Sequence, residues 1–296
     1  MHNIFEKQQE KIRGLVQKDT AASEKKIRIA HVALLQKLCA FMAFNMSGSS
    51  IPRTNMQRSL ILHQVEQMIR ETLREITPII KETIWNAYKN CHNGFLEITE
   101  NLLNEPSTQR WVTDMESEQA VDQNESGYTL SDSIDQYRLK LNMRLRRAIL
   151  RGFRAGKTYE QIAKEVGRLL DMSYRQIRGI LRTTAHTAQE AGFFDAAAKS
   201  NDSFWKIGLM IVKVWVSRRD KKVRDAHRQH SGLDGQRTSL FGKFTIQGHT
   251  AFYPGGFGVA ALDCNCRCFV VYAFVTMEEK EAAAGLARRN KIQQER

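Results

Sequence analysis

Apolar side chains recur at intervals of three and four residues over most of the first two hundred positions, which is the period of an amphipathic helix. In the first hundred positions this spacing predicts two long helices, over residues 3–43 and 55–103. The segment 45–54 contains Gly, Ser and Pro and should separate them. Pro78 should end or kink the second helix, because proline lacks a backbone N–H and clashes with the preceding turn. Helices of this length are expected to pack as a hairpin or bundle.

The apolar period fades over residues 105–133, which are polar and acidic, and we interpret them as a linker. The helical period returns at Ile134, and Gly156 should end that helix. Capping boxes that begin at Thr158 and Ser173 predict two further helix starts, because their side chains satisfy free backbone N–H groups.

After residue 202 the composition shifts toward β-branched and aromatic residues, which favour strands. We expect strands over 210–216 and 268–275, a hairpin of 244–246 with 251–253, and a short polar helix over 219–230. The predicted fold class is α+β and predominantly helical, with an N-terminal long-helix region and a C-terminal α+β domain that contains a small antiparallel sheet. The predicted boundaries are 1–104 for the helical N-terminal region, 105–133 for the acidic linker, 134–275 for the α+β domain and 276–296 for a charged C-terminal tail.

The formal net charge is +13, which favours acidic partners such as nucleic acid or an acidic protein surface. The charge is unevenly placed, with ten acidic residues and one basic residue over 97–135 but thirteen basic and three acidic residues over 138–182. The two blocks are either ordinary solvated helix faces of opposite sign or a functional basic face beside an acidic segment.

Neither a membrane span nor signal-peptide secretion is expected. No apolar run approaches the roughly 18 residues of a membrane helix, and the N-terminus lacks the pattern of a secretory signal. The chain has five cysteines, an odd number, and three of them fall within 264–268. This usage favours a reduced, intracellular origin over a secreted disulfide scaffold.

Two polar clusters could carry chemistry. On the predicted helix over 219–230, Asp220, Arg224 and His227 are spaced at i, i+4 and i+7 and would share one face. In the alternative structural interpretation, Asp220 caps the helix, Arg224 is a surface base and His227 contacts a loop.

The second cluster is the run from Cys264 to Cys268. If it is extended, its three cysteines share one face while Asn265 and Arg267 share the other. The thiolates could bind Zn²⁺ together with an imidazole from His227, His230 or His249. The C-x-C-x-C spacing is atypical for zinc, so we favour buried thiols, with a zinc site or a disulfide as alternatives. No complete catalytic motif is present, so we expect no enzymatic activity and no required cofactor.

The order of these motifs resembles the phage Mu F-like (head morphogenesis) family of tailed-phage minor head proteins. The resemblance covers residues 137–272 and is carried by Ile177 to His186, Trp215-Val-Ser, Arg219-Asp-x-x-Val-Arg-Asp-x-His227, Asp234-Gly235, Tyr253-Pro-Gly255 and Asn265-Cys-Arg-Cys268. The polar residues of the family map onto Asp220, Arg224, His227, Cys266 and Cys268, and Cys264 is an addition beside the cysteine pair.

The resemblance implies a minor capsid protein in the virion head of a tailed bacteriophage, assembled in the host cytoplasm. Its partners would be the portal protein, the major capsid protein or both, with packaged double-stranded DNA as a further partner. A distant relation of the family to ADP-ribosyltransferases says little about activity here. The face expected to meet DNA or an acidic portal surface comprises Arg144, Arg146, Arg147, Arg151, Arg154 and Lys157.

Two other functions stay open at this point. One is a metal- or nucleotide-dependent enzyme built on His227, Cys266 and Cys268. The other is a DNA-binding regulator in which the helices over 158–170 and 173–184 mimic a helix-turn-helix.

We also expect the two polar clusters to converge when the last strand folds beside the strand that ends at Ser217. They would then either bind Zn²⁺ or be fastened by an Asp220–Arg224 pair. We favour the metal-free, structural version, because no fourth ligand is obvious.

Overall fold

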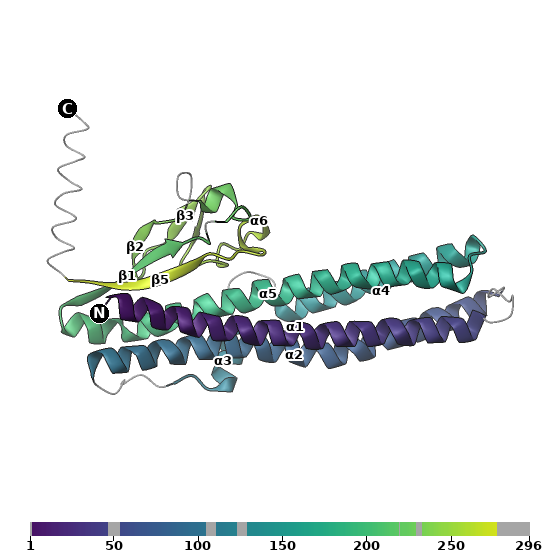
Figure 1. Ribbon diagram of the computed structural model, residues 1–296, viewed down its shortest axis with the longest axis horizontal. Helices are drawn as coiled ribbons and strands as arrows, with labels where there is room; N and C mark the ends of the chain where they lie inside the picture. Colours follow the sequence, from purple (N-terminus) through teal and green to yellow (C-terminus); the bar gives the residue numbers. More distant parts are fainter. Residues whose placement is uncertain are drawn as a thin grey trace, which may run out of the picture. The chain divides into compact units, whose positions relative to one another are not determined.

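The computed structural model describes residues 2–46, 54–104, 111–122, 129–218, 220–228 and 233–276. Its helices are α1 (His2–Met46), α2 (Asn55–Leu103), α3 (Asp114–Asp122), α4 (Leu130–Arg154), α5 (Tyr159–Lys206) and the short α6 (Ala260–Asp263) (Figure 1). The strands are β1 (Leu209–Val216), β2 (Arg237–Ser239), β3 (Phe244–Ile246), β4 (His249–Ala251) and β5 (Phe269–Thr276), with a 3-10 helix η1 at Asp225–His227. The predicted α+β, predominantly helical class is confirmed.

The chain divides into two compact units. The bundle unit comprises residues 18–84 and 127–184, and the sheet unit comprises residues 1–17, 85–126 and 185–296. Helices α1, α2 and α5 each contribute one stretch to both units. This division into compact units groups residues 18–84 with the segment that begins at 127, and the predicted domain boundaries stay predictions.

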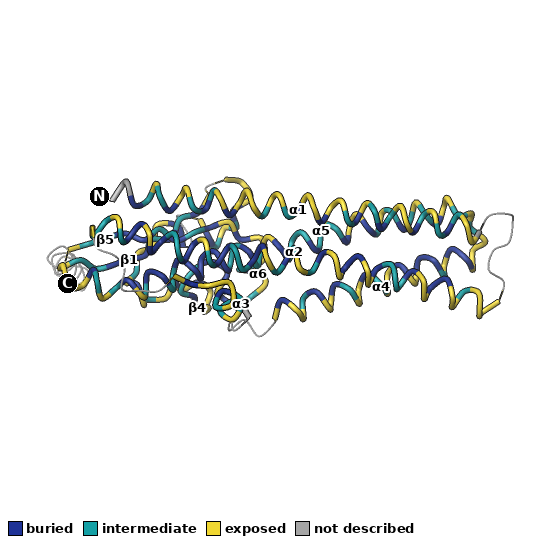
Figure 2. The backbone as a smooth tube through the Cα atoms, turned by 90° about the horizontal axis from the view of Figure 1, so that it is seen from below, coloured by how far each residue is buried: buried dark blue, intermediate teal, exposed yellow. Residues whose placement is uncertain are grey.

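In the bundle unit, four helical stretches bury apolar side chains that recur with the helical period. Buried and exposed positions alternate along each helix (Figure 2). The core includes Ile27, Leu34 and Leu38 of α1, Ile69, Ile76 and Ile80 of α2, Leu141, Leu145 and Ile149 of α4, and Ile162, Val166 and Leu181 of α5. One polar contact in this core joins His31 Nε2 to the Tyr137 hydroxyl at 2.7 Å.

Two of the helix ends considered from the sequence are absent. Pro78 lies inside α2 and does not end it, because Ile76 and Ile80 on either side are fully buried and their packing holds the helix together. Ser173 does not start a new helix. It is a buried residue within α5, where the apolar period runs without a break from Leu170 to Ile177. The two helices considered as a helix-turn-helix are therefore one continuous helix, which removes that alternative.

The predicted end of the helix before Gly156 and the predicted helix start at Thr158 are confirmed. α4 ends at Arg154 and is followed by Gly156 at φ 63°, and Thr158 and Gln161 bond each other's backbone N–H groups at the start of α5. The segment interpreted as a linker contains α3 and the first turn of α4. That turn is capped by reciprocal bonds between Thr129 and Asp132, a box with Asp in place of the usual Glu or Gln.

By length and composition alone, α1 could cross a membrane over Phe5–Asn45. Core helices of soluble proteins pass the same test. Ile27, Leu34 and Leu38 within this stretch are buried in the bundle unit. The absence of a membrane span stays a prediction.

The sheet unit contains a three-stranded antiparallel sheet in the order β2-β1-β5. β1 and β5 pair over their full lengths, from Leu209 opposite Thr276 to Val216 opposite Phe269, so both predicted strands are confirmed within a residue or two. The predicted hairpin is present as β3–β4, but its second strand is His249–Ala251 and not 251–253. Its two turn residues, Gln247 and Gly248, both have positive φ, which suits the right-handed twist of a hairpin. The predicted tail beyond residue 276 lies outside the described residues.

Candidate functional site

The candidate site lies where β1 ends and β5 begins, within the sheet unit. Ser217, just after β1, donates its backbone N–H to Asp234 Oδ1 at 2.7 Å. The N–H of Gly235 donates to the carbonyl of Trp215 at 2.8 Å. Asp234 and Gly235 therefore fasten the returning chain to the end of β1.

The polar segment after β1 is not the predicted helix over 219–230. A turn bonds Val223 N–H to Asp220 O at 3.1 Å, Arg224 is extended, and only Asp225–His227 form a 3-10 turn. Residues 219, 229 and 230 lie outside the described residues. Asp220 and Arg224 therefore do not lie one above the other on a helix.

The predicted pair of Asp220 with Arg224 is consequently wrong, because each contacts the cysteine-bearing segment instead. Asp220 accepts two hydrogen bonds from Arg267, both at 2.6 Å. These bonds lower the pKa of Asp220 to about 2. Arg224 donates to the carbonyl of Leu262 at 3.1 Å and to that of Cys264. The Asp220–Arg267 pair and the bonds of Arg224 to backbone carbonyls therefore hold the segment after β1 against the cysteine-bearing segment. A single Asp220–Arg224 pair was expected to do this.

The three cysteines do not share a face. Cys264 is exposed and follows the last turn of α6, and Asn265 is exposed and reverses the chain at φ 55°. The extended backbone begins only after this reversal. Cys266 and Cys268 flank Arg267 and are both buried, as expected for alternate positions in an extended segment.

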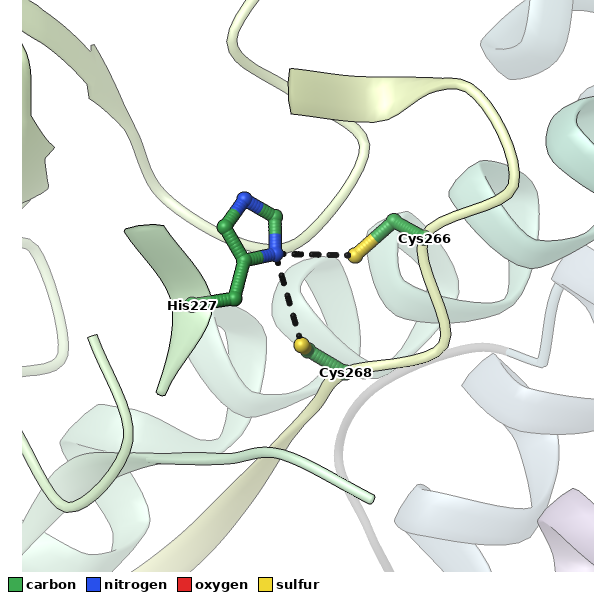
Figure 3. Close-up of side chains that lie close together, drawn as sticks. All are labelled: His227, Cys266 and Cys268. Atoms are coloured by element: carbon green, nitrogen blue, oxygen red, sulfur yellow. Dashed lines mark hydrogen bonds between the residues drawn. The ribbon is translucent and has the colours of Figure 1, made fainter. Parts of the chain in front are cut away.

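His227 lies against these two buried cysteines (Figure 3). Its Nδ1 is 3.6 Å from Cys266 Sγ and 3.5 Å from Cys268 Sγ. The three side chains are almost completely buried, at 1%, 6% and 2% exposure for His227, Cys266 and Cys268. The structure thus brings together the three residues singled out as potential metal ligands. His249, another candidate, is exposed on β4, and His230 lies outside the described residues.

A second histidine, His186 of α5, also interacts with Cys266. Burial alone would lower the pKa of His186, but the bond with Cys266 and nearby negative charge raise it above its ordinary value. Its Nε2 is buried and has no hydrogen-bond partner among the described residues. The sequence motif that ends at His186 drew attention to this helix, but nothing in the spacing linked His186 to the cysteines.

The two thiols share their protons unequally. Contact with Cys268 and with the two imidazoles lowers the pKa of Cys266 despite its burial. Contact with Cys266, together with burial, raises the pKa of Cys268. One of the two thiols is therefore the easier to deprotonate, and a thiolate is the form of cysteine that binds metals.

The loop between β4 and β5 is positioned by tight contacts. The Asp263 carboxylate accepts hydrogen bonds from the N–H groups of Phe257 and Val259, at 3.2 and 3.1 Å. Gly255 has φ 87°, and a Cβ atom there would lie 2.3 Å from Thr187 Oγ1 of α5. Glycine at this position allows the loop to approach α5 one residue beyond His186.

The predicted basic face lies on α4 and the turn after it, in the bundle unit. Arg144, Arg146, Arg147, Arg151 and Arg154 are exposed and Lys157 is half-buried. Arg151 and Lys157 share Glu165, at 2.8 and 3.4 Å. The other four arginines form no ion pair within the described part of the chain.

A second basic feature of the bundle unit is a hollow of about 430 Å³ between α2 and α4. Its lining includes four bases, Arg70, Arg74, Lys81 and Arg138, and one acid, Asp135. Sequence reasoning assigned no role to this hollow, because its bases come from two helices that are far apart in the chain.

Comparisons with known proteins support the resemblance inferred from the motifs. Residues 143–271 match the family described as Phage Mu protein F like protein. The chain is similar to the minor head protein GP7 of Bacillus phage SPP1, with 31% identity over 145 residues, which cover 49% of this chain and 44% of that protein. It is also similar to the NAD(+)–arginine ADP-ribosyltransferase EFV of Enterococcus faecalis, with 34% identity over 146 residues, which cover 49% of this chain and 28% of that protein. No solved structure matches.

The family match spans residues 143–271, which is less than half of this chain. The similarity to a phage minor head protein falls on the same half of the chain and agrees with this match. The chain spans less than half the length of either relative.

Proposed function

We propose that this protein is a minor head protein that assists head morphogenesis in a tailed phage and resides in the virion head. The family match over residues 143–271 carries this proposal, and the similarity to a minor head protein supports it. Its partners would be the portal protein, the major capsid protein or both, and assembly would take place in the host cytoplasm.

The contacts of Asp220 and Arg224 and the burial of His227 favour a structural role over a catalytic one. Asp220 is engaged by Arg267, and Arg224 is engaged by two backbone carbonyls. His227 is 1% exposed, so a substrate could not reach it without rearrangement of the site. Transferase activity belongs to the name of a relative of which 28% is aligned, and we do not extend it to this chain. Incorporation of ADP-ribose from labelled NAD by the purified protein would contradict this part of the proposal.

Mass spectrometry of purified virions and proheads tests the main proposal. The protein should be present in both, in far fewer copies than the major capsid protein. Its absence from both particles would refute the assignment. Chemical cross-linking in proheads should then yield peptides that join it to the portal or to the major capsid protein.

We further propose that the basic face of α4 contacts packaged DNA. The supporting observation is that Arg144, Arg146, Arg147 and Arg154 form no ion pair with described residues while exposed to solvent. Arginines that are not neutralised within the protein can contact phosphates and release counterions. The basic hollow between α2 and α4 adds positive charge to the same unit.

Salt-dependent binding to a double-stranded DNA fragment tests this contact. Replacement of the four arginines by Gln should reduce the slope of log affinity against log salt by up to about 3–4, at about 0.9 for each phosphate contact. The matched control replaces four exposed bases of α1 by Gln, namely Lys25, Lys26, Arg28 and Lys37. Equal effects of the two quadruple variants would mean that net charge, and not this face, sets the affinity.

A further inference from the structure

The arrangement of His227, Cys266 and Cys268 has the dimensions of a metal site. In a tetrahedral zinc site, Zn–S bonds of about 2.3 Å and Zn–N bonds of about 2.0–2.1 Å place nitrogen and sulfur ligands about 3.5 Å apart. The two distances from His227 Nδ1 to the sulfur atoms are 3.6 and 3.5 Å. All three ligand atoms lie within 4.8 Å of one another. The side chains thus already have the spacing that a shared ion requires (Figure 3).

The cysteine spacing is compatible with such a site. Cys266 and Cys268 lie in the extended segment that leads into β5, on either side of exposed Arg267. Side chains at alternate positions of an extended segment point the same way. The positive φ of Asn265 turns Cys264 out of this register, so the relevant motif is one C-x-C pair and not three cysteines.

The candidate for a fourth ligand is His186, which lies outside the group of three residues whose ligand atoms are all within 4.8 Å of one another. It reaches the cluster from α5, contacts Cys266 and has a buried Nε2 without a hydrogen-bond partner among the described residues. Two thiolates and two neutral imidazoles form a Cys₂His₂ set, which is typical of structural zinc sites. Such a set neutralises the charge of Zn²⁺, which a buried site requires.

The surroundings also suit thiolate ligands. The indole N–H of Trp215 is buried, has no oxygen or nitrogen acceptor among the described residues and lies beside Cys268 Sγ. Donors that face a ligating sulfur orient it and stabilise its negative charge. Arg267, which is paired with Asp220, also interacts electrostatically with both sulfurs.

We propose that His186, His227, Cys266 and Cys268 bind one structural zinc ion. The ion would join α5, the 3-10 turn after β1 and the segment before β5, three parts of the chain that are far apart in sequence. The described residues between β1 and β5 form short strands, short helices and turns, and small regions of this kind, with few long elements, gain most from a metal.

Metal analysis of the full-length protein, purified under reducing conditions without chelators, tests the proposal. We expect about one zinc per chain. Cys266→Ser and Cys268→Ser should lose the metal, whereas Cys264→Ser, which changes an exposed neighbouring thiol, should keep it. Equal zinc contents in these three variants would refute the site. Wild-type protein free of zinc would refute it as well.

Spectroscopy keeps the test decisive if the ligand variants fold poorly. Wild-type protein in which Co²⁺ replaces zinc should show the intense visible bands of a tetrahedral site and a thiolate-to-metal charge-transfer band. Removal of the metal should lower the melting temperature, and zinc should restore it. A melting temperature that is insensitive to chelation, or a Cys266–Cys268 disulfide found by peptide mass spectrometry in freshly purified protein, would overturn the proposal.

His186→Ala tests the fourth ligand separately, with His249→Ala on exposed β4 as its control. Loss of an outer-shell partner already costs 10- to 100-fold in metal affinity, so we expect loss of a ligand to weaken zinc binding by about tenfold or more. The control should bind zinc as the wild type does. An unchanged affinity in His186→Ala would exclude His186 from the coordination shell.

Discussion

Gln9 and Tyr272 are joined by two hydrogen bonds in the sheet unit. The side-chain amide of Gln9 donates to the carbonyl of Tyr272 at 3.0 Å, and its carbonyl oxygen accepts from the Tyr272 N–H at 3.3 Å. β5 pairs with β1 on one side only, so its other edge would present unpaired backbone groups. The Gln9 amide therefore replaces a neighbouring strand at one position of this edge, which protects it from pairing with another chain.

Gln9→Ala should leave the buried N–H and carbonyl of Tyr272 without partners. Each unsatisfied buried group costs about 1–3 kcal/mol, so we expect a loss of at least about 1–3 kcal/mol in the free energy of unfolding. Urea denaturation measures this loss. Gln17→Ala changes an exposed glutamine of the same helix and should stay within about 0.5 kcal/mol of the wild type. Similar stabilities of the two variants would show that water replaces the Gln9 amide.

The same edge is bonded two residues earlier by a buried ion pair. Glu190 accepts from the Val270 N–H at 2.9 Å and lies 3.3 Å from Arg13 Nε, while Arg13 donates to the Val270 carbonyl at 2.6 Å. Arg13 also lies over the ring of Phe193, 4.4 Å from its centroid. Side chains of the helices thus bond the backbone of β5 at positions 270 and 272. The contact at position 270 buries two opposite charges.

Glu190→Gln should therefore be strongly destabilising, although it keeps the size and the acceptor of the side chain. It leaves the Arg13 charge buried without a counterion, which costs about 3–5 kcal/mol. The matched control is Glu66→Gln, which breaks the solvent-accessible ion pair of Glu66 with Arg70 on α2, where we expect less than about 1 kcal/mol. The double variant Arg13→Met/Glu190→Gln should recover part of the loss. A double variant less stable than Glu190→Gln alone would contradict this account.

Elements with strong local signals could be predicted from the sequence. The β-branched run before Val216 predicts β1, and the long apolar periods predict α1 and α2. The continuity of α5 could not be predicted, because the cap signal at Ser173 is local while the packing that overrides it is tertiary. The edge contacts of Gln9 were also beyond reach, since they join residues 263 positions apart.

The candidate site, too, could be predicted from the sequence only in part. The proximity of His227 to Cys266 and Cys268 followed from their positions at the ends of two strands that pair. The hydrogen-bond partners of Asp220 and Arg224 could not be predicted. They depend on the turn after Asp220 and on the positive φ of Asn265. His186 was missed because only tertiary packing determines which residue of a long helix meets a distant loop.

Gly192 marks a close contact between α5 and α2 in the sheet unit. A Cβ atom at this position would lie 2.3 Å from the carbonyl oxygen of Tyr88, and a backbone atom cannot rotate away. Gly192→Ala should therefore force the helices apart and lower the free energy of unfolding by about 1–3 kcal/mol. At Gly179 of the same helix a Cβ would meet nothing within 4 Å, so Gly179→Ala should stabilise by about 0.5–1 kcal/mol. Thermal unfolding of both variants checks the opposite signs, and a stabilising Gly192→Ala would show that this contact is loose.

Lys213 on β1 carries a buried amine without a counterion among the described residues. Its Nζ donates to the carbonyl of Phe252 at 2.9 Å and lies about 5 Å from the rings of Phe194, Phe244 and Phe252. Burial lowers the pKa of Lys213 to about 7. Between about pH 7 and 10.5 the folded protein therefore holds the amine neutral, while the unfolded chain keeps it protonated.

In this range the unfolded state binds more protons, so the free energy of unfolding should rise with pH by up to about 1.4 kcal/mol per unit from this group. Lys213→Met removes the contribution. Its stability relative to the wild type should be highest below pH 7 and should fall steadily toward pH 10, as measured by urea denaturation at several pH values. Lys243→Met, which removes an exposed ammonium over the same Phe252 ring, is the control for the loss of a lysine. Parallel stability curves for Lys213→Met and the wild type from pH 7 to 10 would mean that Lys213 stays charged when buried and that the aromatic rings and the Phe252 carbonyl replace its water.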